Sequence, residues 1–159
     1  MNGFERPILR ELAIDDAADV AALIRLAFSQ TAVRADPAPS ALRETAEGVA
    51  AVILAGGGLA AWSDGALVAA VLWAEKDGGL YVSRLSVAPE ARGRGLARGL
   101  LAAAEEEARR RGLPRVHLAT RLVFLDNRRL FASCGFVETE LHAHPGYDAP
   151  TFVDLEKIL

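Results

Sequence analysis

The segment VAPEARGRGLARG, residues 87–99, concentrates glycine and arginine immediately before an Ala/Leu-rich run that predicts a helix. Glycine is a poor helix former, so its repetition here indicates that the backbone itself has to face something. The first amides of a helix lack carbonyl partners and favour an anion, which small side chains allow to approach and guanidinium groups neutralise. The small residues are Gly93, Gly95 and Ala97, and the arginines are Arg92, Arg94 and Arg98. The segment therefore predicts a site for a pyrophosphate or another polyphosphate.

Two common phosphate loops fit this segment poorly. A P-loop ends in Gly-Lys-Ser/Thr, which is absent here. The dinucleotide fingerprint needs Gly-x-Gly-x-x-Gly, whereas GRGLARG at residues 93–99 places its third glycine one residue too far along. A purely structural interpretation is that Gly95 allows a strand and a helix to pack closely. Close packing explains neither the arginines nor the repeated glycines, so phosphate binding is the preferred hypothesis.

A third pattern fits better. Residues 92–97, RGRGLA, match Arg/Gln-x-x-Gly-x-Gly/Ala, and LSVAP at 85–89 supplies a strand and a proline before them. NRRLFASCGF at 127–136 resembles a later helix that ends in Gly-Phe. From about Leu80 to Val137 the chain resembles the GNAT superfamily of acyl-CoA-dependent N-acyltransferases, and the order of its expected elements agrees over the rest.

The resemblance implies acetyl-CoA or coenzyme A as the cofactor, with its pyrophosphate on the amides of residues 94–97. The pantetheine arm would run beside the strand at 84–87, which in this family bulges and splays away from its parallel neighbour. An amine would attack the acetyl thioester directly, and a backbone N–H near Leu85 or Val87 would stabilise the oxyanion. The cofactor-binding residues implied are Leu85, Ser86, Val87, Arg92, Gly93, Arg94, Gly95, Leu96, Ala97, Arg98, Asn127 and Phe131.

The chain departs from the family where a tyrosine often serves as general acid, four residues before the Gly-Phe pair. Phe131 stands there and has no proton to give. We expect the thiolate to leave with help from water or another residue, since a thiol of pKa about 8.5 is a fair leaving group. An alkylamine of pKa about 10.4 is mostly protonated at neutral pH, so a base or a water relay must take its proton.

Three residues are candidates for these proton transfers, and each has a plainer interpretation. Tyr147 lies in the predicted turn HPGYDAP, where tyrosine is common on the surface. For Tyr81 on the cofactor strand the preferred interpretation is a packed strand residue, and for Glu75 it is a solvated strand end. His142 and His144 alternate on one expected strand face, but two histidines without a third ligand do not predict a metal site.

The elements that position these residues follow from periodicity and turn signals. Strands are predicted at 7–14, in three runs between 59 and 89, at 115–120, at 135–144 and at 149–158. Helices are predicted at 15–28, from Ser40 to 56–58, from Gly95 to Gly112 and at 127–134. Asp15 or Asp16 is expected to cap the first helix, and Asp126 or Asn127 the last. We therefore predict an α/β fold of the α+β mixed-sheet type, with an antiparallel meander, one parallel β-α-β crossover and helices on both faces.

Composition limits the possible functions. The 159 residues predict one domain, 1–159, and a net charge of −3 argues against nucleic acid as a partner. No leader or membrane-spanning run is evident and there is one cysteine, so a cytoplasmic location is expected. The predicted function is acetylation of a primary amine of a small molecule or peptide. The alternatives are a non-catalytic acyl-CoA sensor, suggested by Phe131, and a nucleotide-binding protein.

Two further expectations concern partners. The loop at 29–40 and the turn at 142–150 should line the acceptor site, where Arg34, His144 and Tyr147 indicate a polar or anionic acceptor. The resemblance to GNAT proteins, which often pair, also makes a homodimer an expectation.

Overall fold

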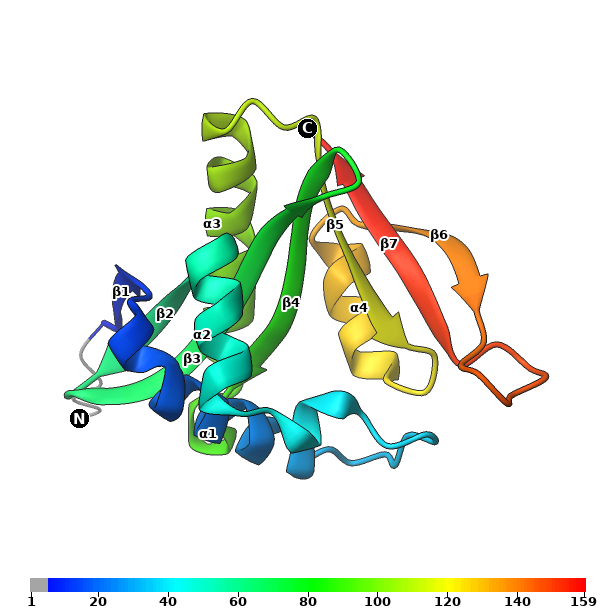
Figure 1. Cartoon of the computed structure of the whole chain (residues 1–159), viewed down its shortest axis with the longest axis horizontal. Helices are drawn as coiled ribbons and strands as arrows, with labels where there is room; N and C mark the ends of the chain where they lie inside the picture. The colour runs from blue at the N-terminus through cyan, green and yellow to red at the C-terminus, as the bar shows by residue number, and fades with distance from the viewer. Residues whose placement is uncertain (1–5) are drawn as a thin grey trace.

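A computed structural model describes residues 6–159 and contains one seven-stranded sheet with the strand order β1-β2-β3-β4-β5-β7-β6 (Figure 1). The strands are β1 (Ile8–Glu11), β2 (Gly57–Ser63), β3 (Ala66–Lys76), β4 (Gly79–Val87), β5 (Arg115–Arg121), β6 (Val137–His142) and β7 (Phe152–Ile158). The helices are α1 (Ala17–Ser29), α2 (Ala46–Ala55), α3 (Leu96–Arg110) and α4 (Leu125–Ser133). Short 3-10 turns occupy Ile14–Asp16, Ser40–Arg43 and Pro89–Ala91.

Strands β2, β3 and β4 form the predicted antiparallel meander. Each of its two turns is an Asp-Gly pair with positive φ at both residues: Asp64 and Gly65 in the first, Asp77 and Gly78 in the second. That conformation matches the right-handed twist of the flanking strands, which is why Asp-Gly closes tight hairpins. Helix α3 then carries the chain to β5, which pairs with β4 in parallel. The mixed sheet with one parallel crossover is confirmed.

Helices cover the two halves of the sheet differently. The six consecutive residues Val68–Trp73 of β3 are all buried, so the meander is covered on both faces. Figure 1 shows α2 in front of the meander and α3 behind it. Burial instead alternates along β5, where Val116, Leu118 and Thr120 are buried and the residues between them are partly exposed. The β5-β7-β6 half therefore has one covered face and one open face.

Several predicted element ends were wrong. The second helix begins at Ala46 instead of near Ser40, because Thr45 adopts an extended conformation and its hydroxyl accepts the Gly48 N–H. The carboxylate of Asp16 accepts the N–H of Ala13 and makes no capping bond to α1.

The last helix and the outer strands also differ from prediction. Helix α4 begins at Leu125 after Phe124, so neither Asp126 nor Asn127 is its cap. Strand β1 covers only Ile8–Glu11 of the predicted 7–14, and β6 stops at His142, which leaves His144 in the connecting loop. Within residues 6–159, no helix is long and apolar enough to cross a membrane.

Candidate functional site

Strand β4 carries a bulge in its second half. Its pairing with β3 runs from Leu72–Ser83 to Ala70–Ser86, so that Arg84 and Leu85 together stand opposite Val71. Arg84 has φ 55°, a left-handed conformation that non-glycine residues adopt rarely. The extra residue bends the strand and turns its following side chains and main-chain groups in new directions.

Side chains of the segment before α2, together with Ser86 of β4 itself, hold this bulge in place. The Arg84 guanidinium donates to the Glu44 carboxylate at 2.9 Å and to the Ser40 hydroxyl at 3.0 Å. The buried Ser86 hydroxyl donates to the Arg84 carbonyl at 3.0 Å. These bonds offset part of the conformational cost of Arg84, which is about 1–3 kcal/mol for a residue in such a region.

Beyond the first pairs, β4 and β5 separate. Their parallel ladder contains Leu80–Val116 and Tyr81–His117, after which the two strands diverge, as Figure 1 shows. The edge of β4 that faces β5 thus has no ladder partner along its bulged half. The bulge and the splay expected from the family resemblance are both confirmed, and together they open the sheet beside main-chain groups that a ligand can pair with.

The glycines before α3 leave space in front of its N-terminus. Gly93 and Gly95 both have φ 79°, and a Cβ added to either would meet no heavy atom within 4 Å. Close packing is therefore not the reason for glycine at these positions. The first helical bond runs from the Gly99 N–H to the Gly95 carbonyl at 3.0 Å, so the amides of residues 96–98 precede it and have no carbonyl partner within the helix.

The arginines of this loop have structural partners that the sequence pattern did not reveal. Arg92 donates to the carbonyls of Ala27 and Gln30, both at 3.1 Å, at the C-terminal end of α1. A cation at that position satisfies free carbonyls and complements the helix dipole. Arg94 donates to the Glu90 carbonyl at 3.1 Å, and Arg98 reaches the sulfur of Cys134 at 3.7 Å.

A cavity of about 510 Å³ lies between the end of α1, the bulged part of β4 and α4. Its walls include seven of the residues predicted to bind the cofactor: Leu85, Ser86, Val87, Arg92, Ala97, Asn127 and Phe131. The other five predicted residues, Gly93, Arg94, Gly95, Leu96 and Arg98, are not in its walls. Arg92 and Ala97 bring the glycine-arginine loop to one end of this cavity.

A second cavity, of about 240 Å³, opens between β4 and β5. Its polar walls include Ser40, Tyr81, Arg84, Thr120, Arg121 and His144. The two cavities share Phe28, Leu85, Phe124, Asn127 and Phe131. A long molecule in the larger cavity and a polar molecule in the smaller one would thus meet beside the β4 bulge.

Of the three residues predicted to transfer protons, only Tyr81 lines the smaller cavity. Burial raises the pKa of the Tyr81 phenol, so it keeps its proton at neutral pH. Tyr147 lines neither cavity; its hydroxyl donates to Asp36 at 2.6 Å, a bond that raises the Tyr147 pKa and ties the two loops expected at the acceptor site. Glu75 lies outside both cavities, 3.4 Å from the Arg111 guanidinium.

The sequence placed His144 at the acceptor site, and His144 does line the smaller cavity, but the sequence gave it no role in proton transfer and did not single out Arg121. Burial first, and then the charge of Arg121, lower the pKa of His144, which contacts the Thr151 hydroxyl through Nδ1. Arg121 donates to the carbonyls of Pro37 and Ala38, and burial lowers its pKa too. An arginine that ends a strand gives no signal of this contact in the sequence.

The sequence model of the acetyltransferase (GNAT) family matches residues 19–136. The chain belongs to this GNAT family. Members of the family use acetyl-CoA, which is the cofactor expected from the sequence. No curated protein matches this GNAT chain.

Solved structures share the fold at low sequence identity. PaiA N-acetyltransferase from Thermoplasma acidophilum, in complex with coenzyme A, is 16% identical with a TM-score of 0.79, covering 98% of this chain and 100% of that one. Ribosomal-protein-alanine N-acetyltransferase from Brucella melitensis is 21% identical with a TM-score of 0.74, covering 96% and 99%. IAA acetyltransferase from Bacillus cereus is 17% identical with a TM-score of 0.70, covering 97% and 100%.

The contacts of Arg92 predict that it stabilises the fold and that Arg98 does not. We expect Arg92→Gln to lower the free energy of unfolding by about 1 kcal/mol, because two carbonyls at the end of α1 lose a charged donor. Arg98→Gln removes the same charge and should change stability by less than about 0.5 kcal/mol. Urea unfolding of both variants measures the difference, and equal stabilities would contradict the structural role of Arg92.

Proposed function

We propose that this GNAT protein transfers an acetyl group from acetyl-CoA to a primary amine of a small molecule or peptide, by direct attack of the amine. The observation that carries the proposal is the meeting of two cavities at Leu85 and Phe131, where β4 bulges and leaves β5. One cavity adjoins the glycine-arginine loop, and the other is lined by polar side chains.

The residues around the larger cavity fit coenzyme A. The open space before Gly93 and Gly95 admits a pyrophosphate to the first amides of α3, where the helix dipole favours an anion. The main chain of Leu85–Val87 offers hydrogen-bonding groups to an amide-bearing arm, and Asn127 reaches the same cavity from α4. When bound, acetyl-CoA would supply a thioester carbonyl that an amine can attack.

We assign His144 as the proton acceptor. It lines the smaller cavity, and its lowered pKa leaves the imidazole neutral at physiological pH, as a base must be. The contact between Nδ1 and the Thr151 hydroxyl orients the ring and leaves Nε2 to receive a proton from the amine, directly or through water.

We assign Tyr81 as the proton donor to the departing thiolate. Phe131, at the position of the family's usual tyrosine, is 6% exposed and lines both cavities without offering a proton. Tyr81 lines the acceptor side and stays protonated because burial raises its pKa. A weak acid such as Tyr81 is sufficient for this step, because a thiolate leaves more readily than an alkoxide.

The charges of the smaller cavity favour an acceptor that carries an anionic group besides its amine. Glu44 forms an ion pair with Arg84, whereas the hydrogen bonds of Arg121 go to two uncharged carbonyls and Asp36 acts on Arg121 only through its charge at longer range. A carboxylate near Arg121 would therefore gain an ion pair. One structural neighbour is named for a ribosomal protein and another for IAA. The shared fold therefore does not decide between a peptide and a small molecule as the acceptor.

A non-catalytic acyl-CoA sensor is the second candidate, because Phe131 removes the usual acid. Such a protein needs the larger cavity but has no use for a neutral histidine and a protonated tyrosine in the smaller one. That polar pair favours an enzyme.

Coenzyme A binding at the glycine-arginine loop is tested with a matched pair of glycine variants. Gly95 and Gly112 stand at opposite ends of α3, both with positive φ and with no heavy atom within 4 Å of an added Cβ. A valine at either position costs similar backbone strain, about 1–2 kcal/mol. We expect Gly95→Val to abolish coenzyme A binding in calorimetry and Gly112→Val to retain it. Unchanged affinity in folded Gly95→Val would exclude this loop as the site.

Release of free thiol separates an enzyme from a sensor. We expect the protein, mixed with acetyl-CoA and a set of primary amines, to release coenzyme A thiol above the amine-free rate. Amines that also carry a carboxylate should react fastest, because Arg121 retains its charge in the acceptor cavity. A protein that binds acetyl-CoA tightly but releases no thiol with any amine would be the sensor.

The role of His144 is tested by substitution and rescue. His144→Ala should lower kcat by at least about tenfold while the KM for acetyl-CoA stays the same, because general base catalysis contributes ~10²–10⁴-fold. Added imidazole should restore part of the lost rate. In the unaltered protein the acidic fall in kcat should lie below pH 6.5, since the lowered pKa keeps the imidazole neutral there. An unchanged kcat in His144→Ala would contradict the assignment.

A further inference from the structure

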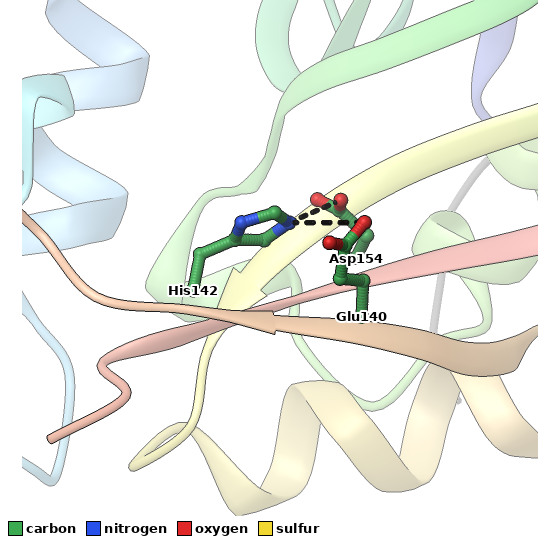
Figure 2. Close-up of side chains that lie close together, drawn as sticks. All are labelled: Glu140, His142 and Asp154. Carbon is green, nitrogen blue, oxygen red and sulfur yellow. Dashed lines mark hydrogen bonds and ion pairs between the residues drawn. The ribbon is translucent and has the colours of Figure 1, made fainter.

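Three potential ligands gather on the open face of the β5-β7-β6 half of the sheet. Glu140 and His142 come from β6 and Asp154 from β7, and one ligand atom from each lies within 4.8 Å of the others. The His142 Nε2 is 2.7 Å from an Asp154 oxygen and 3.9 Å from a Glu140 oxygen. Figure 2 shows the imidazole and both carboxylates pointing toward one another.

A second β-bulge creates this arrangement. Glu138 pairs with Leu155 and Leu141 with Val153, so two β6 residues, Thr139 and Glu140, stand opposite Asp154 alone. Without the extra residue, Glu140 would share a face with Glu138, which reaches across to Arg128 on α4. The bulge instead turns Glu140 to the face that carries Asp154 and His142. A sequence pattern does not reveal this bulge, which is why the sequence predicts no metal site at His142.

The cluster is held in shape and carries an uncompensated negative charge. The His142 ring stacks on Phe152, with centroids 5.0 Å apart and planes at 21°. Among the ion pairs of residues 6–159, Glu140 and Asp154 pair with His142 alone, whereas the neighbouring Glu156 is neutralised by Arg115. Two carboxylates around one imidazole therefore favour a cation at their centre.

We propose that Glu140, His142 and Asp154 form a binding site for a divalent first-row transition metal of the Zn²⁺ type. Imidazole with carboxylates suits zinc, cobalt or nickel, whereas magnesium and calcium prefer oxygen ligands throughout. A tetrahedral ion with bonds of about 2.0 Å needs ligand atoms roughly 3.3 Å apart, within the range that the cluster spans. The ion would take the place of the hydrogen between His142 Nε2 and Asp154, and the neutral imidazole that binds it carries its proton on Nδ1.

The site lies beside the acceptor cavity, outside the catalytic groups assigned above. Phe152 and Tyr81 line both the acceptor cavity and a neighbouring cleft of about 380 Å³ that also contains Glu140 and Asp154. Three protein ligands leave a coordination position open, which water or a donor group of a bound molecule can fill. The site thus opens into a cleft that adjoins the acceptor cavity.

Zinc binding to the full, tag-free chain tests the proposal without reference to acetyl transfer. After chelator treatment, titration with ZnCl₂ in a calorimeter should show one equivalent bound. Glu140→Gln and His142→Ala should each weaken binding by at least the ~10-fold that loss of an outer-shell partner costs. Glu138→Gln is the matched control, since this carboxylate lies on the same strand and pairs with Arg128 instead; its zinc affinity should equal that of the unaltered chain.

Cobalt provides a second measurement that does not depend on variants folding. The Co²⁺ spectrum of the unaltered chain should show d–d bands without the charge-transfer band of a thiolate, and Cys134→Ser should leave it unchanged. Failure of the folded chain to bind Zn²⁺ or Co²⁺ would overturn the proposal. So would Glu140→Gln and His142→Ala proteins that are folded and bind zinc as tightly as the unaltered chain.

Discussion

The parallel ladder between β4 and β5 contains two residue pairs, and the geometry of the site depends on the shortness of this ladder. A strand inside a sheet normally pairs on both edges along its whole length, because a buried N–H or carbonyl without a partner is costly. Here β4 stays paired with β3 on one edge while its other edge is released. The two cavities meet where that edge is free. A bound ligand that satisfies those groups gains hydrogen bonds which folding alone leaves unmade.

The bulge at Arg84 makes this partial release possible, and it depends on contacts far away in the sequence. Arg84 holds a rare backbone conformation while its guanidinium reaches Glu44 and Ser40 in the loop before α2. The same loop region is tied to the far side of the opening, where Arg121 donates to Pro37 and Tyr147 to Asp36. The acceptor side is thus framed by segments that are distant in sequence but linked by charged or short hydrogen bonds.

The sequence predicted the parts of this structure that depend on local chemistry. Asp-Gly pairs give tight turns, glycine at positive φ precedes α3, and apolar runs give the meander in the right order. The predicted helix starts at Ser40 and Asn127 were wrong: the Thr45 hydroxyl caps α2 at a later residue, and α4 begins at Leu125 after Phe124, which makes no side-chain capping bond. Arg92 shows what a local pattern cannot predict. Its type and spacing suit a phosphate loop, yet its guanidinium donates to a carbonyl at the end of α1, 62 residues away in the sequence. The bulge in β6 is hidden in the same way, since it depends on how β7 pairs with it.

Phe131 lies in the wall that the two cavities share, at the position where the family often has a tyrosine that acts as general acid. Its ring is buried, lies edge-on to Phe136 at 6.1 Å and forms part of the wall common to both cavities. A tyrosine there would bring a hydroxyl to this apolar wall, where an unsatisfied polar group costs about 1–3 kcal/mol. Phenylalanine keeps apolar the wall beside which, in the proposed reaction, thioester and amine would meet. In the proposed reaction, proton transfer would be left to the polar side of the opening, where Tyr81 keeps a proton and His144 can accept one. Under that proposal the apolar wall and the proton-transfer groups come from different residues, whereas a tyrosine at position 131 would place both in one side chain.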